Sequence, residues 1–140
     1  QKSLSLPLVL QRIAVISSER AAGYQDFLQH LQQNPYGYQF YLHFFQSTMQ
    51  GDLVESEMLR QLNTIAKAKE NFDCVVIIRG GGARLDLNAF DNFNLCKAVT
   101  SLKIPVFTGI GHDIDETVLD LVAHASLKTP TAVADFIVHH

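Results

Sequence analysis

The sequence has few of the features that mark several common classes of protein. Two cysteines in 140 residues are too few for the disulfide framework of a small secreted domain. The net charge is -3, so the chain lacks the basic face that nucleic-acid binders usually carry. No apolar run approaches the length of a membrane span, and the N-terminus has no signal-peptide pattern. We therefore expect a cytoplasmic protein with no membrane partner. If it acts on nucleic acid, much of its electrostatic grip must come from elsewhere.

The residues that are present fit one globular domain. Hydrophobic residues make up 47% of the chain and charged residues 18%, with no low-complexity run, which predicts a sizeable core. Cys74 and Cys96 lie in apolar or helix-like segments and are expected to be buried thiols. The chain starts without methionine and ends in His139-His140. We expect it to be a piece of a longer protein, and those two histidines, which could belong to a tag, receive no function.

Short apolar segments alternate with segments of helical periodicity along the chain. Residues 1–11 are interpreted as a linker or edge segment, and 12–140 as one domain. Strands that alternate with helices pair in parallel, and wholly apolar strands suit a sheet covered on both faces. The predicted fold class is therefore α/β, with a doubly wound, mostly parallel sheet and helices on both faces. We predict strands at 12–17, 38–45, 73–78 and 105–110, and helices at about 21–33, 53–70, 87–101, 115–123 and from 130 onward.

The segment 73–86, DCVVIIRGGGARLD, is central to the functional interpretation. Its apolar strand runs into Arg79 and then into three glycines, Gly80, Gly81 and Gly82. Three successive glycines indicate a close backbone approach or positive φ angles, and bare N–H groups beside a helix start attract anions. The planar guanidinium of Arg79 suits phosphate recognition. Alternatively, Arg79 ties two loops together through an aspartate. The glycines alone are weak evidence, because RGGG lacks the Lys-Ser/Thr ending of a P-loop.

The segment 109–116, GIGHDIDE, is a second candidate for chemistry. His112 follows a strand end, where an imidazole can transfer a proton near neutral pH while a carboxylate fixes its tautomer. The spacing of His112 and Asp115 would equally suit a divalent metal, and Asp113, Asp115 and Glu116 are the candidate metal ligands. In the alternative interpretation Asp113 or Asp115 caps the next helix, and His112 is a polar loop residue.

The carboxyl ends of the parallel strands should meet at one edge of the sheet, where ligands bind in such folds. The segments expected to converge there are 17–18, 46–48, 79–82 and 109–115, and Ser17 and Ser18 are predicted to contact the substrate. Asp26, one turn into the first predicted helix, is on its own an ordinary surface carboxylate. Asp120 lies within an apolar helical segment, so it should need a partner, either a loop backbone or Arg79.

Taken together, these motifs resemble a known family. From about residue 12 to 138 the chain is similar to the catalytic domain of the large subunit of bacterial exonuclease VII. The resemblance rests on several motifs in the same order: RIAVISS, the helix with Asp26, Gln50-Gly51, VVIIRGGG with the following Asp86, Leu87 and Phe90, IPVFTGIGHDID, and TPTAVAD. The chain departs from the usual family pattern in the rim of the glycine loop and beside the histidine, at Ala83, Leu85, Asn88 and Glu116.

The resemblance implies hydrolysis of single-stranded DNA from its ends, releasing oligonucleotides, by a complex of one large subunit with several small subunits. The family's functional residues fall on Asp26, Arg79, His112 and Asp115, which raises Asp26 from a surface carboxylate to a catalytic candidate. Members of the family often tolerate chelators. We therefore expect no obligatory metal cofactor, with Mg²⁺ as the open alternative.

The resemblance also implies neighbouring domains that these 140 residues do not contain. A single-strand-binding domain normally precedes this region, and a helical region that binds the small subunits follows it. Because those parts would supply the grip on DNA, the isolated piece is expected to be inactive or weak. The competing interpretation is a non-catalytic α/β module that binds a nucleotide or phosphorylated ligand at the RGGG loop. It predicts no loss of cleavage when His112 is changed.

Overall fold

The computed structural model describes residues 1–18, 22–49, 51–68, 71–79, 90–110 and 118–140. Strands and helices alternate along these residues, as the sequence predicts. In chain order they are β1 (Arg12–Ser17), α1 (Ala22–Gln32), β2 (Tyr41–Gln46), α2 (Val54–Lys67), β3 (Cys74–Ile78), α3 (Phe93–Ser101), β4 (Val106–Gly109), α4 (Val118–Val122), β5 (Ala125–Ser126) and α5 (Pro130–His139).

The five strands form one parallel sheet in the order β2-β1-β3-β4-β5. The chain steps from β1 outward to β2, crosses back to β3 on the other side of β1, and then continues outward to β4 and β5. The predicted doubly wound parallel sheet is thus confirmed. Successive connections leave in opposite directions between β1 and β3, which makes this pair the topological switch point of the sheet.

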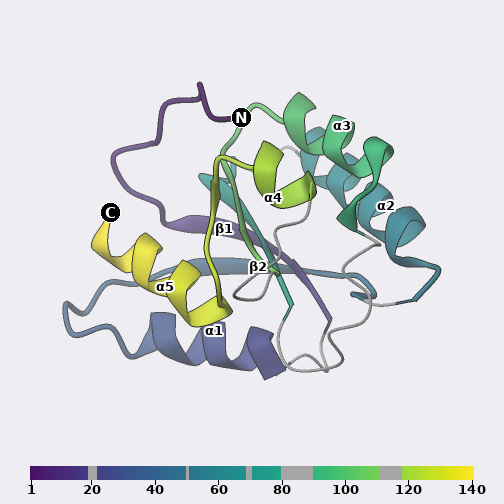
Figure 1. Ribbon diagram of the computed structural model, residues 1–140. Helices are drawn as coiled ribbons and strands as arrows, with labels where there is room; N and C mark the ends of the chain where they lie inside the picture. Colours follow the sequence, from purple (N-terminus) through teal and green to yellow (C-terminus); the bar gives the residue numbers. More distant parts are fainter. Residues whose placement is uncertain (19–21, 50, 69–70, 80–89, 111–117) are drawn as a thin grey trace.

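Helices cover both faces of the sheet (Figure 1). α1 and α5 pack side by side on one face, and α2 and α3 pack together on the other with α4 beside α3. Alternate residues of the central strand β1 enter the two layers: Ile13 and Val15 pack beneath α1 and α5, whereas Ala14 and Ile16 face α2 and α3. Side chains alternate across a strand. A strand covered on both faces is therefore expected to be apolar where it is buried, as β3 is throughout and β1 is from Ile13 to Ile16.

Local sequence explains where two of the helices begin. Thr129 caps α5 by accepting a hydrogen bond from the amide of Ala132 at 3.1 Å, and Pro130 occupies the first helical position, so the predicted start of this helix is confirmed. Asn92 caps α3 in the same way by accepting from Leu95 at 3.1 Å. α3 begins at Phe93, later than the predicted start at about residue 87, and residues 87–89 of the predicted helix lie outside the described residues.

The second strand is shorter than its aromatic sequence predicts. β2 starts at Tyr41 and not at Tyr38, because the preceding residues belong to a turn built on Asn34. The Asn34 side-chain oxygen accepts hydrogen bonds from the amides of Tyr36 at 3.1 Å and Tyr38 at 2.9 Å. Gly37 between them has a φ of 70°. That angle is costly for any residue with a Cβ. The turn overrides the β propensity of the tyrosines.

The amino edge of the sheet is closed by the N-terminal segment. Residues 1–11 form no helix or strand. The side chain of Gln1 makes four hydrogen bonds there. Its Nε2 donates to the carbonyl oxygens of Val99, Leu102 and Ile104, and its Oε1 accepts from the amide of Val106 at the start of β4. In the described part of the chain no helix has both the length and the apolar character needed to cross a bilayer.

Candidate active site

The carboxyl ends of four strands are joined by hydrogen bonds. The Ser47 amide donates to the Ser17 carbonyl at 2.9 Å, which joins β2 to β1. The Ser17 hydroxyl donates to the carbonyl of Ile78 at 2.9 Å, which joins β1 to β3. The Arg79 amide donates to the Gly109 carbonyl at 3.2 Å, which joins β3 to β4. The predicted convergence of the strand ends is confirmed for the residues that the structure describes.

Arg79 is the first residue after β3, beside the switch point, and only 6% of it is exposed. A guanidinium in such a place is not a solvated surface cation, since removing its charge from water is costly unless partners compensate. In doubly wound sheets this is also where ligands bind. The position therefore suits recognition of an anion, which the planar fork of donors favours.

The two serines predicted to contact the substrate differ in access. Ser17 is fully buried, and its hydroxyl is committed to the Ile78 carbonyl. Ser18, the next residue, is partly exposed. Asp26 lies on α1, with its side chain exposed beside the fully buried Phe27. Because α1 starts a few residues after β1, Asp26 belongs to the helix end nearer to the carboxyl edge.

A buried polar pair joins β4 to α4. Asp120 on α4 is 3% exposed, and its Oδ1 accepts a hydrogen bond of 2.8 Å from the hydroxyl of the fully buried Thr108 on β4. The expectation that Asp120 needs a partner is confirmed, and Thr108 is one partner. The pair thus ties β4 to α4, the described elements on either side of residues 111–117.

Gly109 permits the close approach of α5 to the end of β4. A Cβ placed there would lie 2.8 Å from Val133 Cγ2 and 3.1 Å from the Thr129 carbonyl oxygen, well inside normal contact distances. The glycine is thus explained by packing at the start of α5. Its carbonyl is the one that receives the Arg79 amide.

Several predicted site residues lie outside the described residues. These are Gly80, Gly81, Gly82, His112, Asp113, Asp115 and Glu116. Within the described residues no group of three histidine, cysteine or acidic side chains could hold a metal ion. Cys74 and Cys96 are both buried and free, as expected. Burial raises the pKa of each thiol, which keeps them protonated and unreactive.

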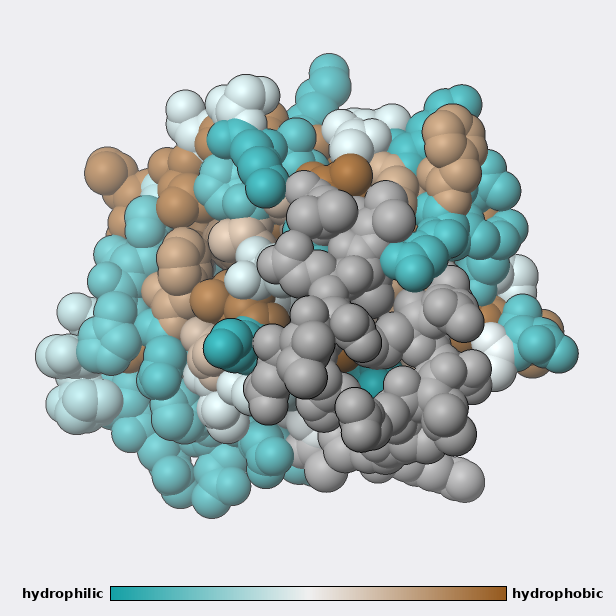
Figure 2. Space-filling model, in the orientation of Figure 1, coloured by the Kyte–Doolittle hydropathy of each residue, from teal (hydrophilic) through white to brown (hydrophobic). Residues whose placement is uncertain are grey.

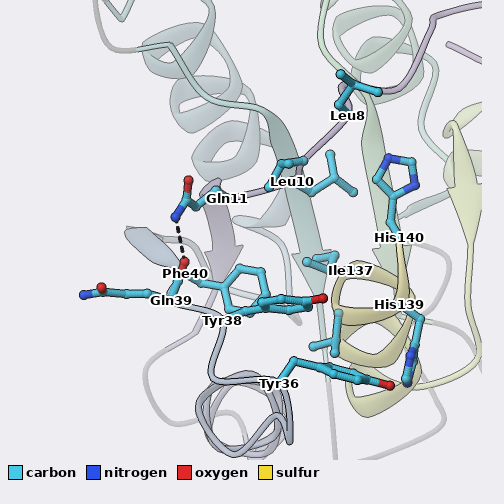
Figure 3. Close-up of a pocket in the computed structure, with 12 residues that line it drawn as sticks. Leu8, Leu10, Gln11, Tyr36, Tyr38, Gln39, Phe40, Ile137, His139 and His140 are labelled. Carbon is cyan, nitrogen blue, oxygen red and sulfur yellow. Dashed lines mark hydrogen bonds between the residues drawn. The ribbon is translucent and has the colours of Figure 1, made fainter.

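A groove of about 460 Å³ lies at the opposite, amino edge of the sheet (Figure 3). The residues just before β1 and β2 and the last turn of α5 line it. The rings of Tyr36 and Tyr38 stack at 5.2 Å, and Tyr36 meets His139 edge-on. In Figure 2 apolar surface gathers over the N-terminal segment and the end of α5. None of the residues predicted for catalysis lines this groove, so the candidate active site and the groove occupy opposite edges.

Comparison with known proteins identifies the family. The family model for exonuclease VII, large subunit, matches residues 1–140. The chain is 33% identical over 135 residues to an exodeoxyribonuclease 7 large subunit of Thermotoga petrophila, covering 96% of this chain and 33% of the relative. It is 37% identical over 129 residues to that of Pseudothermotoga lettingae, covering 92% and 32%, and 35% identical over 138 residues to that of a Nostoc species, covering 99% and 33%.

The chain belongs to the exonuclease VII large-subunit family. It spans about a third of the length of the curated relatives it matches. The family resemblance deduced from the sequence motifs is confirmed.

In this large-subunit chain, sequence reasoning missed what two hydroxyl groups do at the carboxyl edge. Ser17 bonds across to β3, and Thr108 bonds to Asp120. Both are hydroxyl residues at or near the ends of otherwise apolar strands, RIAVIS and VFTG. A polar side chain in a strand buried on both faces requires a partner, and that signal could have identified them.

Proposed function

We propose that this region is the catalytic domain of an exodeoxyribonuclease that hydrolyses single-stranded DNA from its ends to oligonucleotides. Membership of the exonuclease VII large-subunit family supports the reaction class. The structural observation that carries the proposal is the buried Arg79 at the carboxyl edge beside the switch point. A dry cation in that place is suited to stabilising negative charge on a phosphodiester.

The proposed roles follow from the chemistry of each residue. Arg79 and the amides of Gly80, Gly81 and Gly82 hold the scissile phosphate. His112 acts as general base or general acid. Asp115 or Asp26 orients the histidine or the attacking water, and Ser18 contacts the bound strand.

The mechanism is proposed to need no obligatory metal, because Arg79 and the loop amides already supply positive charge to the phosphate. If Mg²⁺ takes part, Asp113, Asp115 and Glu116 are the carboxylates that would bind it, and it would stabilise charge on the phosphoryl oxygens. We further propose that the large subunit works with small subunits in the cytoplasm. The two buried free thiols are consistent with a reducing compartment.

The test uses the full-length large subunit produced together with its small subunit. End-labelled single-stranded and duplex DNA are digested by the wild type and by His112→Ala, each with and without EDTA. We expect single-strand degradation by the wild type, its loss in the variant, and no effect of EDTA. Activity lost in EDTA would assign a metal to the reaction. Equal activity in the variant would overturn the role of His112, and no degradation in either would favour the phosphate-binding module.

A further inference from the structure

The peptide group that precedes the Arg79 side chain is held from both sides. Its carbonyl, on Ile78, accepts the Ser17 hydroxyl at 2.9 Å. Its N–H, on Arg79, donates to the Gly109 carbonyl at 3.2 Å. Ser17 is fully buried and Arg79 is 6% exposed, so both bonds are shielded from water. This peptide plane is thus fixed by one group from β1 and one from β4.

Ser17 makes its bond where the regular pairing of β1 with β3 has ended. The register between these strands stops at Ile16 and Ile77, while β1 stays paired with β2 through Ser17 and Gln46. The main chain of Ser17 also serves β2, since its carbonyl accepts from the Ser47 amide. At the switch point the backbones of β1 and β3 no longer pair, and the Ser17 hydroxyl supplies a hydrogen bond between the two strands instead.

We propose that Ser17 is a positioning residue for Arg79 and not a ligand of the DNA. The inference rests on the proposed function, in which Arg79 binds the scissile phosphate. The peptide plane fixes the position of the Arg79 Cα and so limits the directions in which its Cα–Cβ bond can leave the sheet. A planar guanidinium recognises phosphate only in restricted geometries. A misplacement of about 1 Å can lower a rate by as much as roughly 100-fold, so a hydroxyl that fixes this plane supports catalysis without touching substrate.

Ser47 provides a matched control on the neighbouring strand end. It is also a fully buried serine, but its hydroxyl bonds to the carbonyl of Thr48, within its own segment, at 3.1 Å. Ser47→Ala removes the same group from the same edge without releasing the Ile78 carbonyl. Any loss of activity specific to Ser17 is therefore separated from a general cost of deleting a buried hydroxyl.

The experiment measures kcat and KM on end-labelled single-stranded DNA for the full-length complex, as wild type and carrying Ser17→Ala, Ser47→Ala, Arg79→Lys, or Ser17→Ala combined with Arg79→Lys. We expect Ser17→Ala to lower kcat about 10-fold with little change in KM. Ser47→Ala should stay near the wild type. In the Arg79→Lys background, Ser17→Ala should cause little further loss, because a residue that acts through Arg79 has nothing left to position.

Two results would overturn the proposal. One is an unchanged kcat in Ser17→Ala, and the other is an equal loss in Ser47→Ala. If Ser17→Ala does not fold, Ser17→Cys keeps nearly the same volume with a weak donor and is judged by the same criteria. Failure of the proposed function is recognised separately, since Arg79→Lys alone would then retain full activity. If Arg79→Lys is impaired while Ser17→Ala is not, only the positioning role fails.

Discussion

The two edges of the sheet are built in opposite ways. At the carboxyl edge polar and charged groups are buried: Ser17, Ser47, Arg79, Thr108 and Asp120. At the amino edge apolar side chains are exposed, with Leu8 at 95%, Val9 at 62%, and Tyr36 and Tyr38 each at 54%. Buried polar groups and exposed large apolar groups are the informative exceptions to ordinary burial. In the described residues the buried polar groups lie at or near the carboxyl edge, and the exposed apolar groups of the groove lie at the amino edge. Leu53 and Phe93, at the starts of α2 and α3, are exposed apolar residues outside the groove.

The buried polar groups of the carboxyl edge are a potential cost in folding stability that the amino edge does not carry. Burying a polar group costs free energy unless its hydrogen bonds are made, and hydrogen bonds at the carboxyl edge join β1, β2, β3, β4 and α4. Such a network fixes geometry, which the proposed chemistry needs. The exposed side chains of Tyr36 and Tyr38 at the amino edge stack on one another and contribute little to the geometry of the sheet. We therefore expect a change in activity or stability where a substitution removes a carboxyl-edge group that joins two elements, and much less change in the groove or at Ser47, whose hydroxyl bonds within its own segment.

The largest effect is expected for Arg79→Lys in the full-length complex. Lysine keeps the charge but loses the planar fork, and losing one donor aimed at developing charge lowers kcat by about 100- to 1,000-fold. Tyr38→Leu in the groove is the control and should leave kcat nearly unchanged. Steady-state digestion of end-labelled single-stranded DNA measures both. Equal kcat values for the two variants would contradict the assignment of the catalytic function to the carboxyl edge.

The next largest effect is a loss of stability on replacing either of two glycines, Gly109 and Gly37, which are required for different reasons. In Gly109→Ala the new methyl would meet Val133 and the Thr129 carbonyl, and overpacking of this kind costs about 1–3 kcal/mol. In Gly37→Ala the new methyl has no atom within 4 Å, but the φ of 70° is unfavourable, which costs about 1 kcal/mol.

Urea unfolding of the two variants gives the comparison. Gly37→Asn should recover part of the loss, because asparagine tolerates a positive φ, whereas Gly109→Asn should be worse than Gly109→Ala. Recovery by asparagine at both positions would contradict the steric explanation for Gly109.

The sequence was sufficient for the parts of the fold that depend on local pattern. The apolar runs of β1 and β3, the Met58, Leu62 and Ile65 stripe of α2, and the Thr129-Pro130 start of α5 all follow from periodicity or capping. β5 was missed because two residues carry no periodicity. It exists because Ala125 and Ser126 pair with β4, and the amides of His124 and Leu127 donate to β4 carbonyls on either side. The predicted start of β2 at residue 38 was wrong, because the Asn34 side chain holds the residues up to Tyr38 in a turn, and residue propensities do not describe such hydrogen bonds.

The candidate site was predictable in residue type but not in orientation. Sequence placed Arg79 at a strand end, where it is found. It also required a partner for Asp120, but the partner shown by the structure is Thr108, which the sequence prediction did not name. It could not show that the Ser17 hydroxyl turns toward β3, because that depends on how β1 and β3 separate at the switch point. This is a property of the tertiary fold. The roles of His112 and Asp115 stay predictions.

A smaller loss of stability is expected from Thr108→Val. The substitution is nearly isosteric, but it removes a hydroxyl donor from the buried Asp120 carboxylate, which costs about 1–2 kcal/mol. Thr64→Val is the matched control, since the Thr64 hydroxyl bonds to the Arg60 carbonyl on the exposed side of α2. The control should change the free energy of unfolding by less than about 0.5 kcal/mol. Equal losses in urea unfolding would mean that burial adds nothing to the Thr108 bond.

The smallest effect belongs to Glu57, where the carboxyl edge meets solvent. Its Oε1 accepts the Thr48 amide at 2.7 Å, and this bond holds the pKa of Glu57 below its ordinary value of 4.5. A carboxyl whose pKa is lowered by folding stabilises the protein above its unfolded pKa, and the contribution disappears as the pH falls through the folded pKa.

Glu57→Gln keeps an oxygen for the Thr48 amide but removes the charge, so it isolates the electrostatic part. The wild type should be slightly more stable than this variant at pH 7, and the difference should vanish in acid. Urea unfolding at several pH values measures it. A difference that grew as the pH fell would have the wrong sign for a lowered pKa. Because the group is only half-buried, solvent screens the gain, and a charge at the rim of this edge contributes less than the neutral hydroxyls buried behind it.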